Sequence, residues 1–368
     1  MDRRQFLAAA LAPLALQVVP GTASSNASAA NSERDENMTK TTQRIIEANG
    51  IHINIAEQGE GPLVLLVHGF PETWYSWRHQ IDDLAAAGFR VVAPDMRGYG
   101  KSDAPQAIDQ YTILHLVGDM VGILDALGAP TAVIVGHDWG ASVAWQAALT
   151  RPDRFRAIAA LSVPFRPRAK APPTSLMPHT EAAQFYQLYF QEPGPAEAEL
   201  GRDPRATLRN MLFGASGDGV AAARAAGGTT PNLAIVPKGG GFLQGPGAPP
   251  TLPSWISERD IDHYGEEFKR TGFRGALNYY RNLDRNWEIT GALTGLQVTI
   301  PALYMAGDRD FLLSFPGTDQ LLANLKTIVP GLRKVQMLPG CGHWTQQERP
   351  GEVSAALVEF MRALPSPS

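Results

Sequence analysis

Short aliphatic runs that alternate with helical segments constrain the fold of this chain more than any other feature of its sequence. Residues 63–67 (LVLLV) and 132–135 (AVIV) carry no polar side chain, as is typical of parallel strands covered on both faces. Periodicity and turn residues predict further strands at residues 51–56, 90–93, 157–161, 301–306 and 335–338, and helices at residues 77–87, 112–127, 140–150, 318–327 and 353–364. Strands separated by helices form right-handed βαβ units. The sequence therefore predicts an α/β fold with a mostly parallel central sheet flanked by helices.

The alternation stops between residues 165 and 287, where the chain reads as helical pieces and loops without a buried strand. Pro164 to Pro173 is rich in proline and arginine, and residues 239–253 form a glycine- and proline-rich loop. We therefore predict a core in two parts, residues 43–164 and 288–368. A mainly helical cap at residues 165–287 interrupts this core, and a polar linker at residues 31–42 precedes it.

Composition and charge exclude several classes of protein. The formal net charge of −4 over 368 residues gives no basic field for nucleic acid. The single cysteine, Cys341, excludes internal disulfides and a cysteine zinc site, and we expect it to be a small buried residue in a turn. We predict that the protein uses no metal and no organic cofactor. The sequence does not determine whether it forms a homo-oligomer.

The first residues are typical of an export signal. Arg3 and Arg4 precede the apolar run Phe6 to Val19, and Ala27 to Ala29 offers a small-x-small cleavage site. The order resembles a twin-arginine signal at residues 1–30, so we expect a periplasmic or secreted bacterial protein without a stable membrane anchor after cleavage. An ordinary secretory signal is one alternative. A start at Met38, which would leave the protein in the cytoplasm, is another.

The strand at residues 132–135 runs into Gly136 to Gly140 (GHDWG), and a helix follows. This is the pattern of a strand-turn-helix elbow with Asp138 at the nucleophile position; the bland alternative is a plain glycine-rich connection. A carboxylate is ionised at neutral pH, and the helix N-terminus favours that charge. A carboxylate oxygen suits attack on a saturated carbon, and this attack yields an alkyl ester that water must then hydrolyse.

Hydrolysis of such an ester requires an oxyanion hole and a base. The backbone N–H groups of Trp139 and of Phe70, in the loop of residues 68–72 (HGFPE), are the expected donors, and a cis Phe70–Pro71 bond fits that tight loop. The expected base is His343, the histidine in the loop after the last strand. The other histidines are rivals without that placement: His52, His68, His79, His115, His137, His179 and His263. Asp308 and Asp310 both follow the strand at residues 301–306, and spacing does not choose between them as the acid.

At this point the residues resemble epoxide hydrolases of the α/β-hydrolase superfamily. The resemblance rests on the segments at residues 68–72, 136–140, 310–311 and 342–344 and extends over residues 44–364. It implies the α/β-hydrolase fold, with Asp310 as the triad acid and Asp308 as a turn residue.

Two cap segments, residues 184–194 and 273–282, resemble those that carry the family's two ring-opening tyrosines, and matching positions gives Tyr186 and Tyr280. Tyrosine suits this role because an alkoxide is a poor leaving group and the phenol stays protonated at neutral pH. Tyr189 and Tyr279 are expected to be packing residues, and Tyr279 departs from the tryptophan frequent in the family.

The resemblance implies that an epoxide and water give a vicinal diol through a hydroxyalkyl ester of Asp138. We expect a small apolar substrate that contacts Phe70, Trp139 and Trp344. Haloalkane hydrolysis by the same aspartate is the nearest alternative, because the core motifs do not separate the two activities. A catalytically silent ligand-binding homologue is a further alternative. A serine esterase is disfavoured, since Ser142 lies beyond the elbow.

Overall fold

A computed structural model describes residues 40–226, 234–243 and 247–365. The predicted export signal, the alternative start at Met38 and most of the predicted linker lie outside these described residues. Residues 41–368 form one compact unit.

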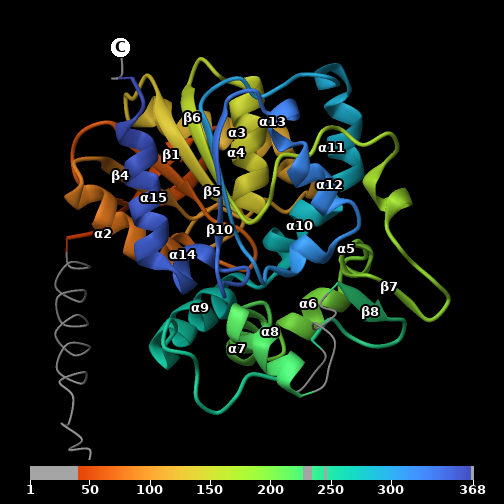
Figure 1. Ribbon diagram of the computed structural model, residues 1–368. Coiled ribbons are helices and arrows are strands. Elements are labelled where there is room, and N and C mark those ends of the chain that lie inside the picture. Colours follow the sequence, from red (N-terminus) through yellow and green to blue (C-terminus); the bar gives the residue numbers. More distant parts are fainter. Residues whose placement is uncertain (1–39, 227–233, 244–246, 366–368) are drawn as a thin grey trace, which may run out of the picture. The chain divides into compact units, whose positions relative to one another are not determined.

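Eight strands of this unit form one mixed sheet in the order β1-β2-β4-β3-β5-β6-β9-β10 (Figure 1). Strand β2 pairs antiparallel with β1 and with β4, whereas the remaining neighbours are parallel. The strands are β1 (Thr42–Ala48), β2 (Ile51–Gln58), β3 (Leu63–Val67), β4 (Arg90–Pro94), β5 (Ala132–His137), β6 (Phe155–Leu161), β9 (Ala302–Gly307) and β10 (Leu332–Leu338). The predicted fold class is confirmed.

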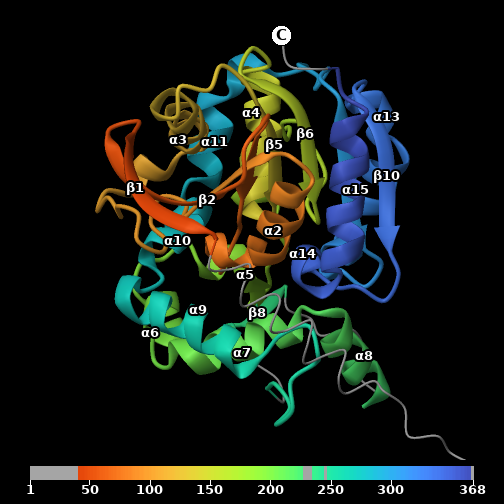
Figure 2. The same cartoon turned by 90° about the vertical axis from the view of Figure 1, so that its left-hand side faces the viewer.

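Strands β3 and β5 are fully buried, because helices cover both faces of the sheet. Helices α2 and α15 contact each other on one face, and α3 and α4 contact each other on the opposite face (Figures 1 and 2). The core helices are α2 (Arg78–Ala86), α3 (Ile113–Ala126), α4 (Trp139–Thr150), α12 (Thr318–Ala323), α13 (Leu325–Ile328), α14 (Thr345–Glu348) and α15 (Pro350–Arg362).

Between β6 and β9 the chain is mainly helical, as predicted, but it also forms a small sheet. Strands β7 (Ala183–Phe185) and β8 (Ile235–Pro237) pair antiparallel. The helices of this segment are α5 (Tyr186–Tyr189), α6 (Pro195–Leu200), α7 (Pro204–Gly214), α8 (Gly217–Ala225), α9 (Glu258–Thr271), α10 (Arg274–Arg281) and α11 (Leu283–Ile289). In both views α6 to α9 lie beyond the edge at which the parallel strands end.

One detail differs from the sequence expectations. The single helix expected at residues 318–327 is two short helices, α12 and α13, separated at Asn324. In strand β2, Asn54 is buried and donates from Nδ2 to Asp95; a hydrogen-bonded polar side chain can be buried at little cost. Within the described ranges, no helix is long and apolar enough to cross a membrane.

Candidate active site

The turn between β5 and α4 places Asp138 in a backbone conformation that few side chains adopt. Its φ is 52° and its ψ is −118°. A Cβ atom on Gly136 would lie 2.1 Å from the Gly140 carbonyl oxygen, and one on Gly140 would lie 2.0 Å from that of Val67. Only glycine therefore fits two positions before and two positions after Asp138, as the elbow pattern requires.

The Asp138 carboxylate does not cap helix α4 and is held by other groups instead. Oδ1 accepts the Phe70 N–H at 2.8 Å, and Oδ2 lies 3.6 Å from Nε2 of His343. Burial alone would raise the pKa of Asp138, but His343, His137 and the Phe70 N–H outweigh burial and hold the pKa below its ordinary value. The carboxylate is thus ionised at neutral pH.

The Phe70 N–H therefore lies where the sequence predicted a donor, and the Phe70–Pro71 bond is cis, as expected. Trp139 begins helix α4 directly after the nucleophile. Its N–H as a second oxyanion donor stays a prediction, although its position in the elbow is the expected one.

Asp310 and His343 come together after β9 and β10. His343 Nδ1 lies 3.2 Å from Asp310 Oδ1, and both side chains are almost fully buried. Asp308 instead accepts the Gly340 N–H at 2.8 Å at the surface. The ambiguity between the two aspartates is therefore settled by position: Asp310 faces the imidazole, and Asp308 supports the turn before it.

Two carboxylates control the charge of His343. Burial alone would lower the pKa of His343, but the charges and hydrogen bonds of Asp310 and Asp138 outweigh burial and raise the pKa to about 10. In the resting enzyme the imidazole is therefore protonated at neutral pH.

Tyr186 and Tyr280 meet over the elbow. Their ring centroids are 5.9 Å apart, and the Tyr280 ring packs edge-on against Trp139 at 5.2 Å and Phe70 at 5.5 Å. Burial raises the pKa of both phenols, and the charge of Asp138 adds to this effect. Both phenols keep their protons at neutral pH, and both are close enough to Asp138 to sense its charge. The Gln187 amide donates to the Tyr186 oxygen at 2.9 Å.

Tyr189 and Tyr279, which lie close in sequence to Tyr186 and Tyr280, make different contacts. The Tyr279 hydroxyl donates to the Arg97 carbonyl at 2.8 Å, and the Tyr189 hydroxyl donates to Glu199 at 2.8 Å. These contacts agree with the expectation that both are packing residues, since each hydroxyl is hydrogen-bonded to a group other than Asp138.

Trp344 is buried beside the base. Its indole N–H donates to the Leu212 carbonyl of α7 at 2.7 Å, and the His343 N–H donates to the Ala215 carbonyl at 2.9 Å. These bonds join the His343 loop to the cap. A contact between Trp344 and a substrate stays a prediction.

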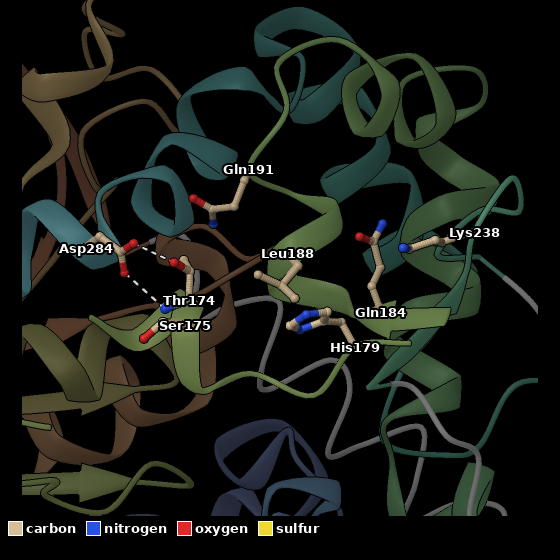
Figure 3. Close-up of a pocket in the computed structure, with 8 residues that line it drawn as sticks. All are labelled: Thr174, Ser175, His179, Gln184, Leu188, Gln191, Lys238 and Asp284. Atoms are coloured by element: carbon tan, nitrogen blue, oxygen red, sulfur yellow. Dashed lines mark hydrogen bonds between the residues drawn. The ribbon is translucent and has the colours of Figure 1, made fainter. Parts of the chain in front are cut away.

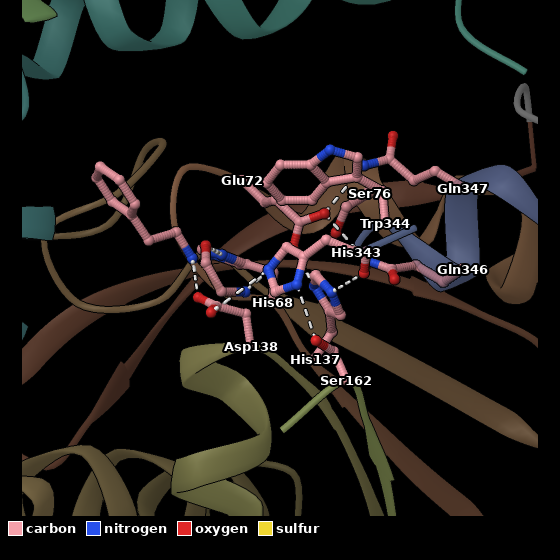
Figure 4. Close-up of polar contacts among 12 residues, drawn as sticks. His68, Glu72, Ser76, His137, Asp138, Ser162, His343, Trp344, Gln346 and Gln347 are labelled. Carbon is pink, nitrogen blue, oxygen red and sulfur yellow. Dashed lines mark hydrogen bonds and ion pairs between the residues drawn. The ribbon is translucent and has the colours of Figure 1, made fainter. Parts of the chain in front are cut away.

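Several buried residues that the sequence did not single out surround these groups (Figure 4). Glu72 accepts from His137 Nδ1 at 2.7 Å and from the side-chain amides of Gln346 and Gln347 at 2.9 Å each. His137 Nε2 lies 2.8 Å from the His343 carbonyl oxygen. Glu72 belongs to the motif quoted for Phe70, but nothing in the motif indicates this role. Ser162, which contacts the imidazole of His343, had no signal in the sequence.

Two hollows are found in this part of the protein, and Asp138 lines neither of them. One, of about 440 Å³, is lined mainly by polar residues and includes Gln184 of β7, Leu188 of α5 and Gln191 (Figure 3). The other, of about 400 Å³, runs along α4 from Trp139 to Leu149. The Asp138 side chain is only partly buried, with 16% of its surface exposed. No group of three His, Cys, Asp or Glu side chains in the part of the chain that the structure describes could hold a metal ion.

The sheet order, the elbow and a triad in the sequence order carboxylate, carboxylate, imidazole define an α/β hydrolase with an aspartate at the nucleophile position. Residues 62–207 match the family model described as the alpha/beta hydrolase fold. The chain is 48% identical over 332 residues to Epoxide hydrolase A of Mycobacterium tuberculosis, which covers 89% of this chain and 99% of that protein. It is therefore a member of the epoxide hydrolase family.

Further comparisons agree. Epoxide hydrolase 3 of Siraitia grosvenorii is 44% identical over 320 residues, or 86% of this chain and 96% of that protein. The crystal structure of Epoxide Hydrolase A from Mycobacterium thermoresistibile superposes with a TM-score of 0.80 at 47% identity, covering 89% of this chain and 100% of that chain.

Proposed function

We propose that this chain hydrolyses epoxides to vicinal diols through a covalent ester of Asp138. The observation that carries the proposal is the pair of buried, protonated phenols, Tyr186 and Tyr280, close to an ionised carboxylate. A carboxylate supplies the nucleophile, and a phenol supplies the proton that an alkoxide leaving group requires. The names of the relatives support the same activity.

In the first half-reaction the phenols hold the epoxide oxygen. The Phe70 N–H donates a hydrogen bond to Oδ1 of Asp138, so Oδ2 is the oxygen that attacks a ring carbon. The carbon–oxygen bond of the ring breaks as the new ester bond forms, and a tyrosine proton passes to the alkoxide. The product is a hydroxyalkyl ester and a tyrosinate, which recovers its proton from water.

In the second half-reaction His343 activates water. Ester formation removes the charge of Asp138, one of the two carboxylates that raise the pKa of His343, so the imidazole loses its proton more easily in the intermediate. The neutral Nε2 then takes a proton from water, which attacks the ester carbon. Oδ1 becomes the oxyanion, stabilised by the N–H groups of Phe70 and Trp139, and Oδ2 leaves with the diol.

Labelled water tests this mechanism. With enzyme in excess in H₂¹⁸O, the first diol should carry no label, and the label should appear in Asp138, as mass spectrometry of the peptide would show. Label in the first diol would mean direct attack by water and would overturn the proposal. Halide release from haloalkanes without diol formation from epoxides would favour the dehalogenase alternative.

Asp138→Asn separates the enzyme proposal from a catalytically silent binding protein. The substitution removes the nucleophile while keeping its size, so in an enzyme diol formation should stop while binding of an apolar epoxide persists. If the unchanged protein forms no diol from terminal, internal or aromatic epoxides, the silent alternative gains support. Phe70, Trp139 and Tyr280 form apolar walls, which favours apolar substrates.

We further infer the organisation and destination of the chain. The core is proposed at residues 43–164 and 288–368 and the cap, which carries the tyrosines, at residues 165–287. The basic, apolar and small-residue order of residues 1–30 supports export to the periplasm or medium. Cell fractionation with N-terminal sequencing tests this: cytoplasmic protein beginning at Met38 would contradict it. Light scattering would establish whether a homo-oligomer forms.

A further inference from the structure

Ser162 follows β6 at the edge of the sheet where the active-site loops gather. Its φ is 71°, in the left-handed region that side chains rarely adopt. The backbone is fixed there, because its N–H donates to Met305 in β9 at 2.8 Å and its carbonyl accepts the Tyr304 hydroxyl at 2.8 Å. A strained residue held by its neighbours at an active site invites a functional explanation.

The Ser162 hydroxyl lies between the acid and the base. Its Oγ is 2.5 Å from Asp310 Oδ2. It is also 2.8 Å from His343 Nδ1 (Figure 4). The direct distances from His343 Nδ1 to the Asp310 oxygens are longer, 3.2 and 3.3 Å. The other carboxylate oxygen of Asp310 accepts the Leu312 N–H at 3.0 Å. The hydroxyl is thus the nearest partner of the imidazole on this side.

These contacts fix where the protons are. A hydroxyl has one proton to donate, and the short contact with the Asp310 carboxylate requires it. Oγ can then only accept at its contact with His343, so Nδ1 must carry a hydrogen. This holds for the imidazolium and for the neutral ring. Nε2, which faces Asp138, is therefore the nitrogen that loses and gains a proton.

We propose that Ser162 is a positioning residue that relays the Asp310 carboxylate to His343 and holds the imidazole as the Nδ1–H tautomer. The hydroxyl accepts from the ring and donates to the carboxylate, so it transmits the stabilisation of the imidazolium that forms when water is activated. No bond is made or broken at Ser162.

The consequence, which rests on the proposed function, is confined to one half-reaction. Attack of Asp138 on the epoxide needs no base, so Ser162 should not affect it. Hydrolysis of the ester needs neutral Nε2 and a stabilised imidazolium. If hydrolysis alone is slowed, kcat and KM fall together while kcat/KM, which is set by ester formation, stays unchanged.

The position offers two complementary variants. Ser162→Gly removes the hydroxyl and suits the positive φ, whereas Ser162→Ala removes the hydroxyl but keeps the strain. A defect common to both belongs to the hydroxyl, and a difference in stability belongs to the backbone. Ser354→Ala is the matched control, because Ser354 is buried in α15 and its hydroxyl has no hydrogen-bond partner within the described residues.

We expect ester hydrolysis to slow about 10- to 100-fold in both variants, the scale of one charge-assisted hydrogen bond. Ester formation should stay within about twofold, and the ester should accumulate in acid-quenched samples analysed by mass spectrometry. Ser354→Ala should match the unchanged protein. Equal slowing of both half-reactions would indicate mere distortion, and unchanged hydrolysis would show no role; either result overturns the proposal.

A second readout does not depend on turnover. Titration of the His343 ring by NMR should give a lower pKa in Ser162→Gly, because a hydrogen bond to the charged ring is lost. The titratable groups facing that ring, Asp138, Asp310 and His137, are the same in both proteins. An unchanged pKa would overturn the proposal. Absence of diol formation in the unchanged protein would instead contradict the proposed function alone.

Discussion

Asp138 shows how one residue serves both geometry and chemistry. Its φ of 52° and ψ of −118° form a backbone conformation that non-glycine residues rarely adopt, which costs about 1 to 3 kcal/mol. The close approach of Gly140 to the β3 backbone maintains this conformation. The result is a carboxylate lifted from the sheet edge with the Phe70 N–H on one oxygen, so the strain is part of how the nucleophile is presented.

The phenols can be tested singly. Tyr186→Phe and Tyr280→Phe should each slow ester formation about 10- to 100-fold, and the double variant should be slower still, because no proton donor then remains. Stopped-flow tryptophan fluorescence, with Trp139 adjacent to the nucleophile, gives the rate.

Tyr279→Phe is the matched control for the phenols. Its hydroxyl bonds to the Arg97 carbonyl, so the variant should lose about 1 kcal/mol of unfolding free energy and keep the rate of ester formation. A double phenylalanine variant that forms the ester at the unchanged rate would refute the role of the pair.

Cys341 gives a prediction about reactivity. Its side chain is buried, and burial raises the pKa of the thiol above its ordinary value. Because the thiolate is the reactive form, a disulfide reagent should label no thiol in the folded protein and one per chain in denaturant. Rapid labelling under native conditions would contradict the burial.

Residues in local motifs were predictable, and residues placed by the tertiary structure were not. Asp138 and His343 follow predicted strands, so their positions could be inferred from the elbow and from chain order. Asp308 and Asp310 share one loop, and their spacing does not choose between them. The family resemblance indicated Asp310, and the structure places Asp310 beside the imidazole. Ser162 is a serine after a strand, with nothing in its neighbours to indicate the positive φ or its contacts.

At the scale of elements, Glu348 in α14 organises the loop that carries the base. Its carboxylate accepts the N–H groups of Gly342 and Trp344, on either side of His343, at 2.9 and 3.1 Å. It also accepts the N–H of Gly217, the first residue of α8, at 2.9 Å. One side chain therefore joins a core loop to a cap helix.

Glu348→Gln should weaken this junction. The amide oxygen can replace one carboxylate oxygen, but the NH₂ group must face a backbone N–H, which leaves a buried donor unsatisfied. We expect a loss of about 1 to 3 kcal/mol, measured by urea denaturation.

Glu352→Gln is the control for this change. Glu352 makes an exposed ion pair with Arg349, so this variant should change the free energy of unfolding by less than about 0.5 kcal/mol. Equal stability of the two variants would show that Glu348 does not hold the junction.

Elements with strong periodicity were predictable, and those that depend on distant pairing were not. Strands β3 and β5 are aliphatic throughout and were found from sequence. Strands β7 and β8 have three residues each and pair across most of the cap segment, so neither has enough length for a pattern. Their pairing sets the start of α5 at Tyr186, because the Tyr186 N–H donates to the Ala234 carbonyl.

At the scale of the whole catalytic unit, the sheet explains why residues far apart in sequence meet. Phe70, Asp138, Ser162, Asp310 and His343 each follow a different strand of the parallel part of the sheet. The carboxyl ends of parallel strands share one edge, which is where α/β proteins bind ligands. The cap then brings its tyrosines over that edge, so the active site depends on both parts being folded together.

This coupling predicts how stability depends on pH. The folded-state pKa of His343 is about 10, above the value of about 6.5 expected in the unfolded chain. Its contribution is therefore fully present below about pH 6.5 and is lost as the pH rises through about 10. Asp138 has a lowered pKa, so its contribution is present above its unfolded pKa and is lost as the pH falls through the folded value.

Urea denaturation of the unchanged protein and of His343→Gln between pH 6 and pH 10 tests this linkage. The other titratable groups are the same in both proteins, so their contributions cancel in the difference. The excess stability of the unchanged protein should fall across this range by an amount on the order of a few kcal/mol. Parallel stability curves would mean that His343 is not held as an imidazolium, and the ion pairs with Asp138 and Asp310 would then not carry the stability assigned to them.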